Sequence, residues 1–298
     1  MGKKKIKSEN SKLIIAISSR ALFNLDYSHK IFKEEGIKAY AKHQQENEHI
    51  ILEPGVGFTL VKKLLNLNSK KTPIDVILLS RNSADTGLRI FNSIEHYGLN
   101  ISRAAFTRGE STHPFVGAFE ADLFLSSNYN DVQKALQSGY AAASIVESKS
   151  NNSHPSQLRI AFDGDAVIFS DEAERIFQEK GLEAFHENEV LSEKIELKAG
   201  PFKSFLVSLQ KIQSTFPEEN NPIRTALVTA RSAPSHKRVI HTMREWGIRI
   251  DESFFLGGLE KGVFLRQFAA DIFFDDQQQH CYSASKYVPT GHVPSGIK

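Results

Sequence analysis

The chain contains two similar halves, and this internal repeat limits the folds open to it more than any other feature. The segment that starts at Ala16 (AISSRALFNLDYSHKIFKEEGIKAY) aligns without a gap with the segment that starts 145 positions later at Ala161 (AFDGDAVIFSDEAERIFQEKGLEAF). Further along, the offset becomes 149, and ADLFLSSN matches ADIFFDDQ, so that Asp122 aligns with Asp271. So many matches in one order indicate a duplicated unit.

Each half alternates short apolar runs with longer amphipathic segments. Short β-rich apolar runs predict buried strands, and glycine-terminated amphipathic segments predict helices. Strands that alternate with helices predict an α/β fold, here two tandem Rossmann-like units with parallel sheets. The strands are expected at 13–17, 76–79, 158–162 and 225–229, and helices at 88–98 and 236–247. We expect a basic tail over 1–12, a first unit over 13–148, a polar linker over 149–157 and a second unit over 158–298.

Composition and charge exclude several classes of function. The 298 residues include 40% hydrophobic and 24% charged residues, which is typical of a globular protein. A net charge of +2 gives no strong field to attract a nucleic acid polymer or an anionic membrane. Cys281 is the single cysteine, so an intrachain disulfide is excluded. The apolar run at 13–17 is too short for a signal sequence or a membrane span, and we expect a cytoplasmic protein.

Four separate segments of the second half bring polar side chains to the ends of predicted strands or to the start of a predicted helix. The carboxyl edge of a parallel sheet is where such folds place their sites. Several carboxylates at one edge repel one another unless a cation neutralises them, and hard oxygen ligands favour Mg²⁺. With a metal and a lysine present, a phosphate can be held while an aspartate attacks its phosphorus, which predicts phosphoryl transfer through an aspartyl-phosphate. The residues are Asp163, Asp165, Thr229, Lys261, Asp275 and Asp276.

The motifs around these residues resemble two known groups of proteins. DGDAV at 163–167, LVT at 227–229, the lysine and the DD pair resemble the four signatures of the haloacid dehalogenase superfamily of phosphatases. The longer strings SSRALF, LLSRNSADTGLRIFNSIEHYGL, RAAFTRGES, AFDGDAVIFSDEAER, GPF and FFDDQ resemble the cytosolic 5'-nucleotidase I family, from about residue 13 to 285. This resemblance implies a Mg²⁺-dependent 5'-nucleotidase that hydrolyses nucleoside 5'-monophosphates, with AMP favoured, to nucleoside and phosphate.

The resemblance also implies a role for each residue of the site. Asp163 would be the nucleophile, and Asp165 would act as general acid and then as base. Thr229 would donate a hydrogen bond to a phosphoryl oxygen, and Lys261 would offset negative charge. The metal would be held by Asp163, the backbone carbonyl of Asp165, and Asp275 and Asp276, and which of this last pair ligates directly is open. Ala230 and Arg231, which follow Thr229, are further candidates for substrate binding.

The first half lacks the catalytic residue types at the aligned positions. Ser18 aligns with the nucleophile, Arg20 with the acid, and Thr112 with the lysine. Arginine stays charged and cannot donate a proton, so this half cannot perform the same chemistry. Either it is a scaffold, or its strand-end residues form an anion or nucleotide pocket for the substrate's base or, as the resemblance implies, for a regulatory adenine nucleotide. The pocket candidates are Ser18, Arg20, Arg81, Asn82 and Ser83.

Several alternatives remain open at the level of sequence. The stretch 171–224 resembles the small cap insertion of this superfamily, which would cover the site and select the leaving group. A phosphatase or phosphotransferase that acts on another small phosphorylated metabolite would share every catalytic residue. A nucleotide-sensing binding protein is the alternative from another class, and the intact Asp163, Asp165 and Lys261 argue against it. A homo-oligomer is compatible with each of these hypotheses.

Overall fold

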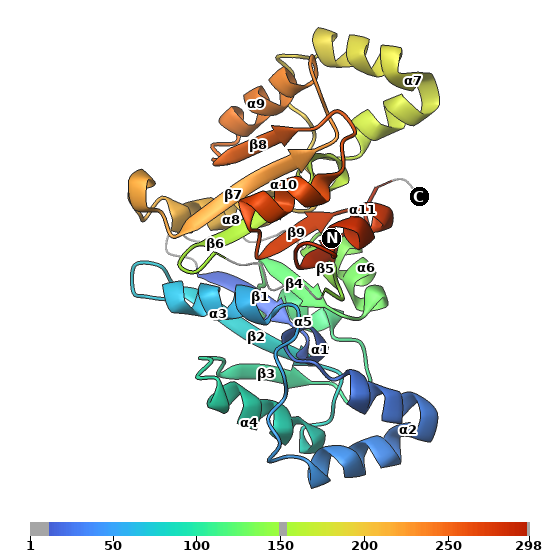
Figure 1. Ribbon diagram of the computed structural model, residues 1–298, viewed down its shortest axis with the longest axis vertical. Helices are drawn as coiled ribbons and strands as arrows, with labels where there is room; N and C mark the ends of the chain where they lie inside the picture. Colours follow the sequence, from blue (N-terminus) through green and yellow to red (C-terminus); the bar gives the residue numbers. More distant parts are fainter. Residues whose placement is uncertain (1–11, 149–153, 297–298) are drawn as a thin grey trace.

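One sheet of ten strands runs through both halves of the chain (Figure 1). The computed structural model describes residues 12–148 and 154–296, so residues 1–11 of the expected tail and 149–153 of the expected linker lie outside the described residues. Its strand order is β3-β2-β1-β4-β5-β10-β9-β6-β7-β8. The strands are β1 (Leu13–Ile17), β2 (Ile74–Ser80), β3 (Arg103–Phe106), β4 (Leu123–Ser126), β5 (Ala141–Val146), β6 (Leu158–Phe162), β7 (Ile223–Thr229), β8 (Glu252–Phe255), β9 (Ile272–Asp275) and β10 (Thr290–His292).

Neighbouring strands are parallel except at the centre of the sheet, where β5 and β10 pair antiparallel. The α/β class and the mostly parallel pairing agree with the prediction from sequence. The sequence predicted two parallel sheets, and the structure instead joins the two halves edge to edge in one sheet. The strands of each half follow the same spatial order, read outward from this central pair.

Helices and short turns connect the strands and cover both faces of the sheet (Figure 1). In the described part of the chain, no helix has the length and apolar character needed to cross a membrane. The helices and turns are α1 (Ser19–Leu22), α2 (Asp26–Glu46), α3 (Phe58–Leu67), η1 (Asp85–Gly87), α4 (Leu88–His96), α5 (His113–Ala118), α6 (Tyr129–Gln137), η2 (Gly164–Ile168), α7 (Glu172–Leu191), α8 (Lys203–Gln213), η3 (Glu218–Asn220), α9 (His236–Glu245), α10 (Lys261–Phe268) and α11 (Gln278–Ala284).

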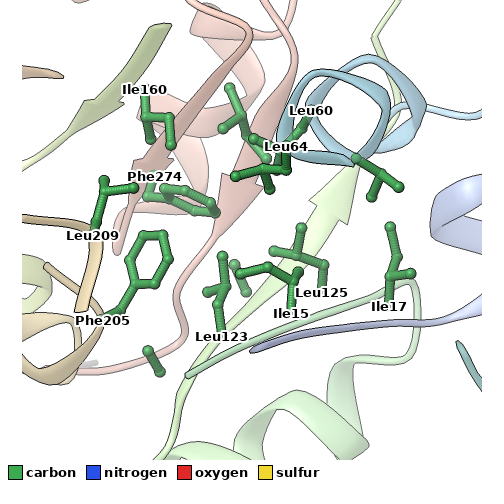
Figure 2. Packing of buried hydrophobic residues seen from close by; sticks show 14 of the residues in the cluster. Ile15, Ile17, Leu60, Leu64, Leu123, Leu125, Ile160, Phe205, Leu209 and Phe274 are labelled. Carbon is green, nitrogen blue, oxygen red and sulfur yellow. The ribbon is translucent and has the colours of Figure 1, made fainter. Parts of the chain in front are cut away.

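The largest hydrophobic core belongs to both halves at once. Figure 2 shows Ile15 and Leu64 of the first half in the same cluster as Ile160, Phe205 and Phe274 of the second. Burial of apolar side chains is the main favourable term in folding, so this shared core holds the halves together. The opposite face of the sheet carries two separate smaller clusters, one in each half.

Matching hydrogen bonds recur in the two halves at the offsets of the sequence repeat. Arg89 donates from Nε to the carbonyl oxygen of Ile50 at 2.8 Å, and Arg238 donates from Nε to that of Ile195 at 2.9 Å. The two arginines lie 149 positions apart and the two isoleucines lie 145 positions apart, which are the two offsets of the aligned segments. The repeat is therefore visible in side-chain contacts as well as in the order of the strands.

The stretch 171–224, which was expected to be a cap, contains two helices with different surroundings. Helix α8 packs on the sheet through Phe205 and Leu209, so it belongs to the main core (Figure 2). Helix α7 projects from the sheet on the right of Figure 1, and its buried residues are Ala173 and Glu189. In the first half, α2 projects in the same way, and α3 packs on the sheet as α8 does. A cap confined to the second half is therefore not confirmed.

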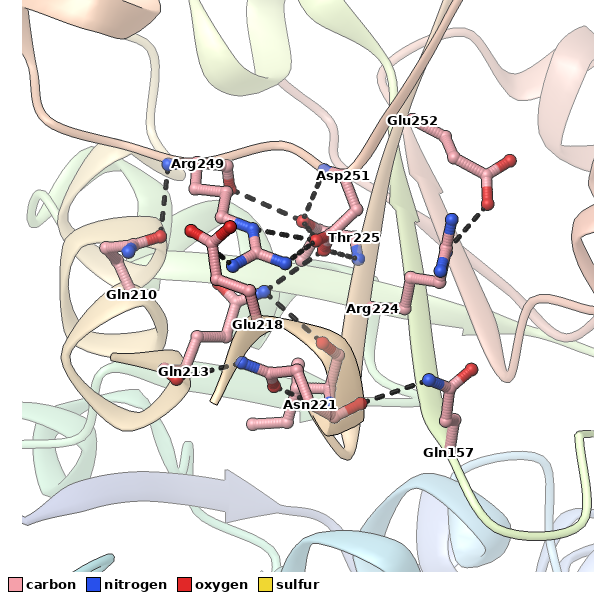
Figure 3. A network of polar contacts seen from close by, with 11 residues as sticks. Gln157, Gln210, Gln213, Glu218, Asn221, Arg224, Thr225, Arg249, Asp251 and Glu252 are labelled. Atoms are coloured by element: carbon pink, nitrogen blue, oxygen red, sulfur yellow. Dashed lines mark hydrogen bonds and ion pairs between the residues drawn. The ribbon is translucent and has the colours of Figure 1, made fainter. Parts of the chain in front are cut away.

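A polar network fixes the amino end of β7, away from the predicted site (Figure 3). The carboxylate of Asp251 accepts hydrogen bonds from the backbone and hydroxyl of Thr225 at 2.8 and 3.1 Å, and from Gln213 at 3.3 Å. Arg249 also donates to Asp251, at 2.6 and 2.8 Å. Buried polar groups are costly unless they are satisfied in this way. The network anchors the strand while its carboxyl end stays available for the site.

Candidate active site

Three catalytic candidates of the second half meet at the carboxyl edge of the sheet. Asp163 follows β6 directly, Asp275 ends the neighbouring strand β9, and Lys261 begins α10. The Lys261 ammonium lies 2.9 Å from Asp163 Oδ1 and 2.7 Å from Asp275 Oδ2. All three side chains are almost completely buried. The structure thus brings together Asp163 and Asp275, which are more than a hundred positions apart in the sequence, at the edge where the strand pattern places a site.

The electrostatics of this cluster are those of closely packed, desolvated charges. Burial raises the pKa of Asp163 to about 7, and the negative charge of Asp275 adds to this effect while Lys261 opposes it. Burial also raises the pKa of Asp276 to about 9, with Asp163 and Asp275 contributing in the same direction. These shifts mean that ionisation of Asp163 and Asp276 costs free energy in the folded protein, and a nearby cation reduces this cost.

The acidic cluster has the donor set that a hard divalent cation prefers. Asp163, Asp275 and Asp276 each offer a carboxylate oxygen, and these oxygens lie within 4.8 Å of one another. Oxygen ligands in this number suit Mg²⁺, which is usually held by carboxylates together with water and substrate oxygens. The residues therefore fit the metal that the sequence implied.

Thr229 lies beside Gly164, in the turn that follows Asp163, where the sequence predicts a phosphate-binding hydroxyl. It is the last residue of β7 and is buried, and its Oγ1 accepts a hydrogen bond from the backbone N–H of Arg231 at 3.2 Å. A Cβ placed on Gly164 would lie 3.3 Å from this oxygen, so the hydroxyl faces the backbone between Asp163 and Asp165. Ala230, the next residue, is exposed beyond the strand end.

Asp165 makes different contacts from the other carboxylates of the site. Both of its oxygens accept hydrogen bonds from Arg231, each at 2.8 Å, in a bidentate ion pair. Arg231 also donates to Glu189 of α7 at 2.5 Å, and Glu189 accepts from Arg238 at 2.8 Å. Phe185 of the same helix packs over the guanidinium, with 5.5 Å between Arg231 Cζ and the ring centroid. Arg231, a candidate for substrate binding, is therefore engaged with Asp165.

Glu189 and Arg238 were not among the residues singled out from the sequence. A glutamate in a polar helical segment is normally exposed, so nothing in its surroundings marks it as buried. The signal lies in the repeat, because Glu189 aligns with Gln44 and Arg238 aligns with Arg89. Gln44 is also buried and accepts a hydrogen bond from Arg89 at 3.3 Å.

The five pocket candidates of the first half line one cavity of about 800 Å³ at the carboxyl ends of β1, β2 and β4. Arg81 forms a bidentate ion pair with the buried Asp131, and Asn82 accepts a hydrogen bond from Tyr40 at 2.9 Å. Arg20 pairs with Asp26 at 3.0 Å, and its Nε has no hydrogen-bond partner. The candidates are Ser18, Arg20, Arg81, Asn82 and Ser83.

This cavity is separate from the catalytic cluster. Strands β1 and β6, which precede the two sites, are separated by β4, β5, β10 and β9, a separation of about 24 Å at the usual strand spacing. The first-half candidates therefore do not contact a phosphate held at Asp163.

Comparisons with known proteins agree with the geometry of the site. The profile of the 5'-nucleotidase family matches residues 5–298. Human cytosolic 5'-nucleotidase 1B is 40% identical over an alignment of 288 residues that covers 92% of this chain and 47% of that protein, so the chain spans about half the length of this relative. No solved structure gave a significant match. These findings confirm the resemblance inferred from the motifs, and the chain belongs to the 5'-nucleotidase family.

Proposed function

We propose that this protein hydrolyses nucleoside 5'-monophosphates, with AMP as the first candidate, to nucleoside and phosphate. The observation that carries the proposal is the buried cluster in which Lys261 contacts both Asp163 and Asp275 beside Asp276. Membership of the 5'-nucleotidase family supports the substrate class. The name of the human relative also supports a cytoplasmic location.

The residues divide the reaction into two steps. In the first, a carboxylate oxygen of Asp163 attacks phosphorus, the bond from phosphorus to O5' breaks, and Asp165 gives a proton to O5'. In the second, Asp165 takes a proton from water, which attacks the aspartyl-phosphate and releases phosphate and the Asp163 carboxylate. Lys261 and the hydroxyl of Thr229 stabilise the charge on the phosphoryl oxygens. A Mg²⁺ ion held by Asp163, Asp275, Asp276 and the Asp165 carbonyl would neutralise phosphate charge.

The test is phosphate release from a panel of purine and pyrimidine ribo- and deoxyribonucleoside 5'-monophosphates and sugar phosphates, with Mg²⁺ or with EDTA. We expect release from nucleotides that depends on the metal, and the preferred base then identifies the substrate. Release from sugar phosphates alone would retain the mechanism and refute the nucleotidase assignment. Nucleotide binding without any turnover would instead support the sensor hypothesis.

We expect Mg²⁺ to raise the thermal stability of the protein even without substrate. A ligand that binds only the folded state at tenfold above its Kd adds about 1.4 kcal/mol. The increase in Tm, measured by calorimetry with Mg²⁺ against EDTA, should disappear in Asp276→Asn, which loses one carboxylate of the cluster. Asp75→Asn, in an ion pair with Arg103 on the first half, is the control and should keep the full increase. An equal increase in both variants would contradict a metal site at Asp276.

We further propose that the first-half cavity binds a second, regulatory nucleotide. Its lining combines basic side chains, among them Arg20 and Arg81, with apolar ones such as Leu25 and Phe32, which suits a phosphate joined to a flat base. Contacts also link it to the catalytic half. Tyr129, adjacent to the lining residue Asn128, stacks on His292 with 6.1 Å between the ring centroids, and His292 Nε2 contacts the Asp276 carbonyl at 2.9 Å.

A second nucleotide site predicts how many nucleotides bind to each chain. Calorimetric titration of Asp163→Asn, which does not turn over, should show two equivalents of adenine nucleotide per chain. Arg20→Met in the same background should retain one of them, because Arg20 lines only the first-half cavity. A single equivalent in the Asp163→Asn protein would show that the first half is a scaffold.

We also propose that the chain is a duplicated haloacid dehalogenase-type unit, with halves over 13–148 and 158–298. The shared strand order and the matching contacts of Arg89 and Arg238 support this proposal. The first half would have kept the architecture and lost the catalytic side chains.

A further inference from the structure

We propose that Arg231 is a positioning residue for Asp165, and that Glu189 of helix α7 determines where Arg231 lies. This inference rests on the proposed function, in which Asp165 exchanges a proton with the leaving group and with water. It gives α7 a defined part in the reaction, because Glu189 connects that projecting helix with the acid at the strand edge.

The geometry places Arg231 at the centre of a chain of four charges, in which Asp165 is partly exposed and the other three are buried. It donates from Nε and Nη2 to the two oxygens of Asp165 and from Nη1 to Glu189. Glu189 also accepts a hydrogen bond from Arg238. Nε of Arg238 donates to the backbone carbonyl of Ile195, and this contact fixes the far end of the chain of charges. The side chain of Arg231 is 2% exposed and that of Glu189 is 0% exposed. In such surroundings, charge-assisted hydrogen bonds are strong and set side-chain orientation.

This arrangement has a direct consequence for proton transfer. Both oxygens of Asp165 accept hydrogen bonds from the guanidinium, so Arg231 sets the orientation of the carboxylate. This pair has to loosen before Asp165 can turn towards O5' of a substrate and give a proton. Glu189 makes this possible, because it offers Arg231 a second carboxylate and keeps the cation compensated when Asp165 leaves.

The first half of the chain provides an internal comparison. At the aligned positions, Arg20 replaces Asp165, Asn82 replaces Arg231 and Gln44 replaces Glu189. Gln44 is buried like Glu189, and it donates from Nε2 to the hydroxyl of Tyr40 at 2.9 Å. Helix α2, which is the counterpart of α7 in the first half, therefore packs at this position with a neutral amide. Arg238 has a counterpart in Arg89, whereas the linked set of Asp165, Arg231 and Glu189 is present only in the half that also carries the proposed nucleophile, which points to a role in the reaction and not in folding.

The helix itself supports this interpretation. Of the 20 residues of α7, Ala173 near its start and Glu189 near its end are buried. Phe185 of the same helix lies over the guanidinium of Arg231. The last two turns of α7 thus contact Arg231 through both Phe185 and Glu189. Arg231 therefore connects the position of the helix with the orientation of Asp165.

The test compares two leaving groups in Glu189→Gln, which reproduces the residue of the first half. Without Glu189, Arg231 has only Asp165 as a counter-charge, so Asp165 is released less readily. We expect kcat for the nucleotide to fall on the order of tenfold or more, within the range that general acid catalysis contributes. For p-nitrophenyl phosphate, whose leaving group departs without protonation, kcat should change less than about threefold.

Two further variants separate positioning from a general effect on the fold. Arg231→Lys keeps the charge but cannot form the bidentate pair, so Asp165 is released more readily, and adding Glu189→Gln to this variant should lower the nucleotide kcat less than it does in the wild type. Glu193→Gln, close to the end of α7 and paired with Lys237 on the surface, should leave both substrates unaffected. Equal losses for both substrates in Glu189→Gln, or no loss for either, would overturn the inference.

The same measurements distinguish this inference from the proposed function. If the wild type hydrolyses p-nitrophenyl phosphate and some alkyl phosphate but no nucleotide, the proposed function fails. The comparison of leaving groups is then made with that alkyl phosphate, and the positioning role stands or falls by the same criterion. A wild type that hydrolyses none of these compounds overturns both.

Discussion

Replacing Asp163 with asparagine is expected to lower kcat for nucleotide hydrolysis by a factor on the order of 10⁴ or more. The amide has nearly the same shape, so it still fits between Lys261 and the backbone of β6, but it has no negative oxygen to attack phosphorus. It also removes one carboxylate from the cluster of Asp163, Asp275 and Asp276. Phosphate release under saturating nucleotide and Mg²⁺ measures the effect, and trapping of phosphorylated protein in the wild type alone locates the intermediate.

Asp75→Asn makes the same chemical change at an ion pair of β2 in the first half and should leave kcat within about twofold of the wild type. Circular dichroism and Tm establish that both variants are folded. Removing the charge of Asp163 relieves repulsion within a buried cluster, so this variant should be at least as stable as the wild type in EDTA. A variant that retains a tenth or more of the wild-type kcat would exclude Asp163 as the nucleophile.

The sequence pointed to the aspartates of the acidic cluster because one rule applies to Asp163 and Asp275 alike. Parallel strands in an α/β fold deliver the residues that follow them to one edge, and Asp163 and Asp275 follow or end neighbouring strands. Lys261 joins them because α10 begins at that residue. The combination of carboxylates, a hydroxyl and a lysine then limited the predicted chemistry to phosphoryl transfer. These predictions needed no knowledge of how the two halves pack.

The junction between the halves could not be predicted in this way. Strand β10 has three residues, TGH, which carry no hydrophobic alternation. Its pairing with β5 depends on the whole fold, since β10 is placed by β9 on one side and by β5 on the other. Strand pairing is decided by tertiary contacts that local patterns do not contain. For the same reason, the two halves were expected to have separate sheets.

The contacts of Asp165 were missed for a related reason. Its role as acid and base was implied by resemblance, while its partner Arg231 was assigned to substrate binding from its position after Thr229. The bidentate pair between them depends on the turn at Gly164–Ile168, and the anchor at Glu189 depends on the packing of α7. Only the alignment of Glu189 with Gln44 could have drawn attention to this position before the structure was known.

Replacing Lys261 with methionine is expected to destabilise the protein by about 3–5 kcal/mol in EDTA, the cost of leaving buried charges without their partner. Burial by itself lowers the pKa of Lys261, but Asp163 and Asp275 raise it above its usual value, so the ammonium is held charged between them. Methionine fills the space but leaves Asp163 and Asp275 buried beside each other without a counter-charge. Urea-induced unfolding at neutral pH measures the loss.

The same unfolding experiment provides its own controls. Lys198→Met removes a lysine from an exposed pair with Glu172 and should cost less than about 1 kcal/mol. Adding Asp275→Asn to Lys261→Met removes one of the two opposed carboxylates and should recover part of the lost stability, as should Mg²⁺, which supplies the missing positive charge. Equal losses in Lys261→Met and Lys198→Met, or a double variant less stable than Lys261→Met, would show that Asp163 and Asp275 are not held together by Lys261.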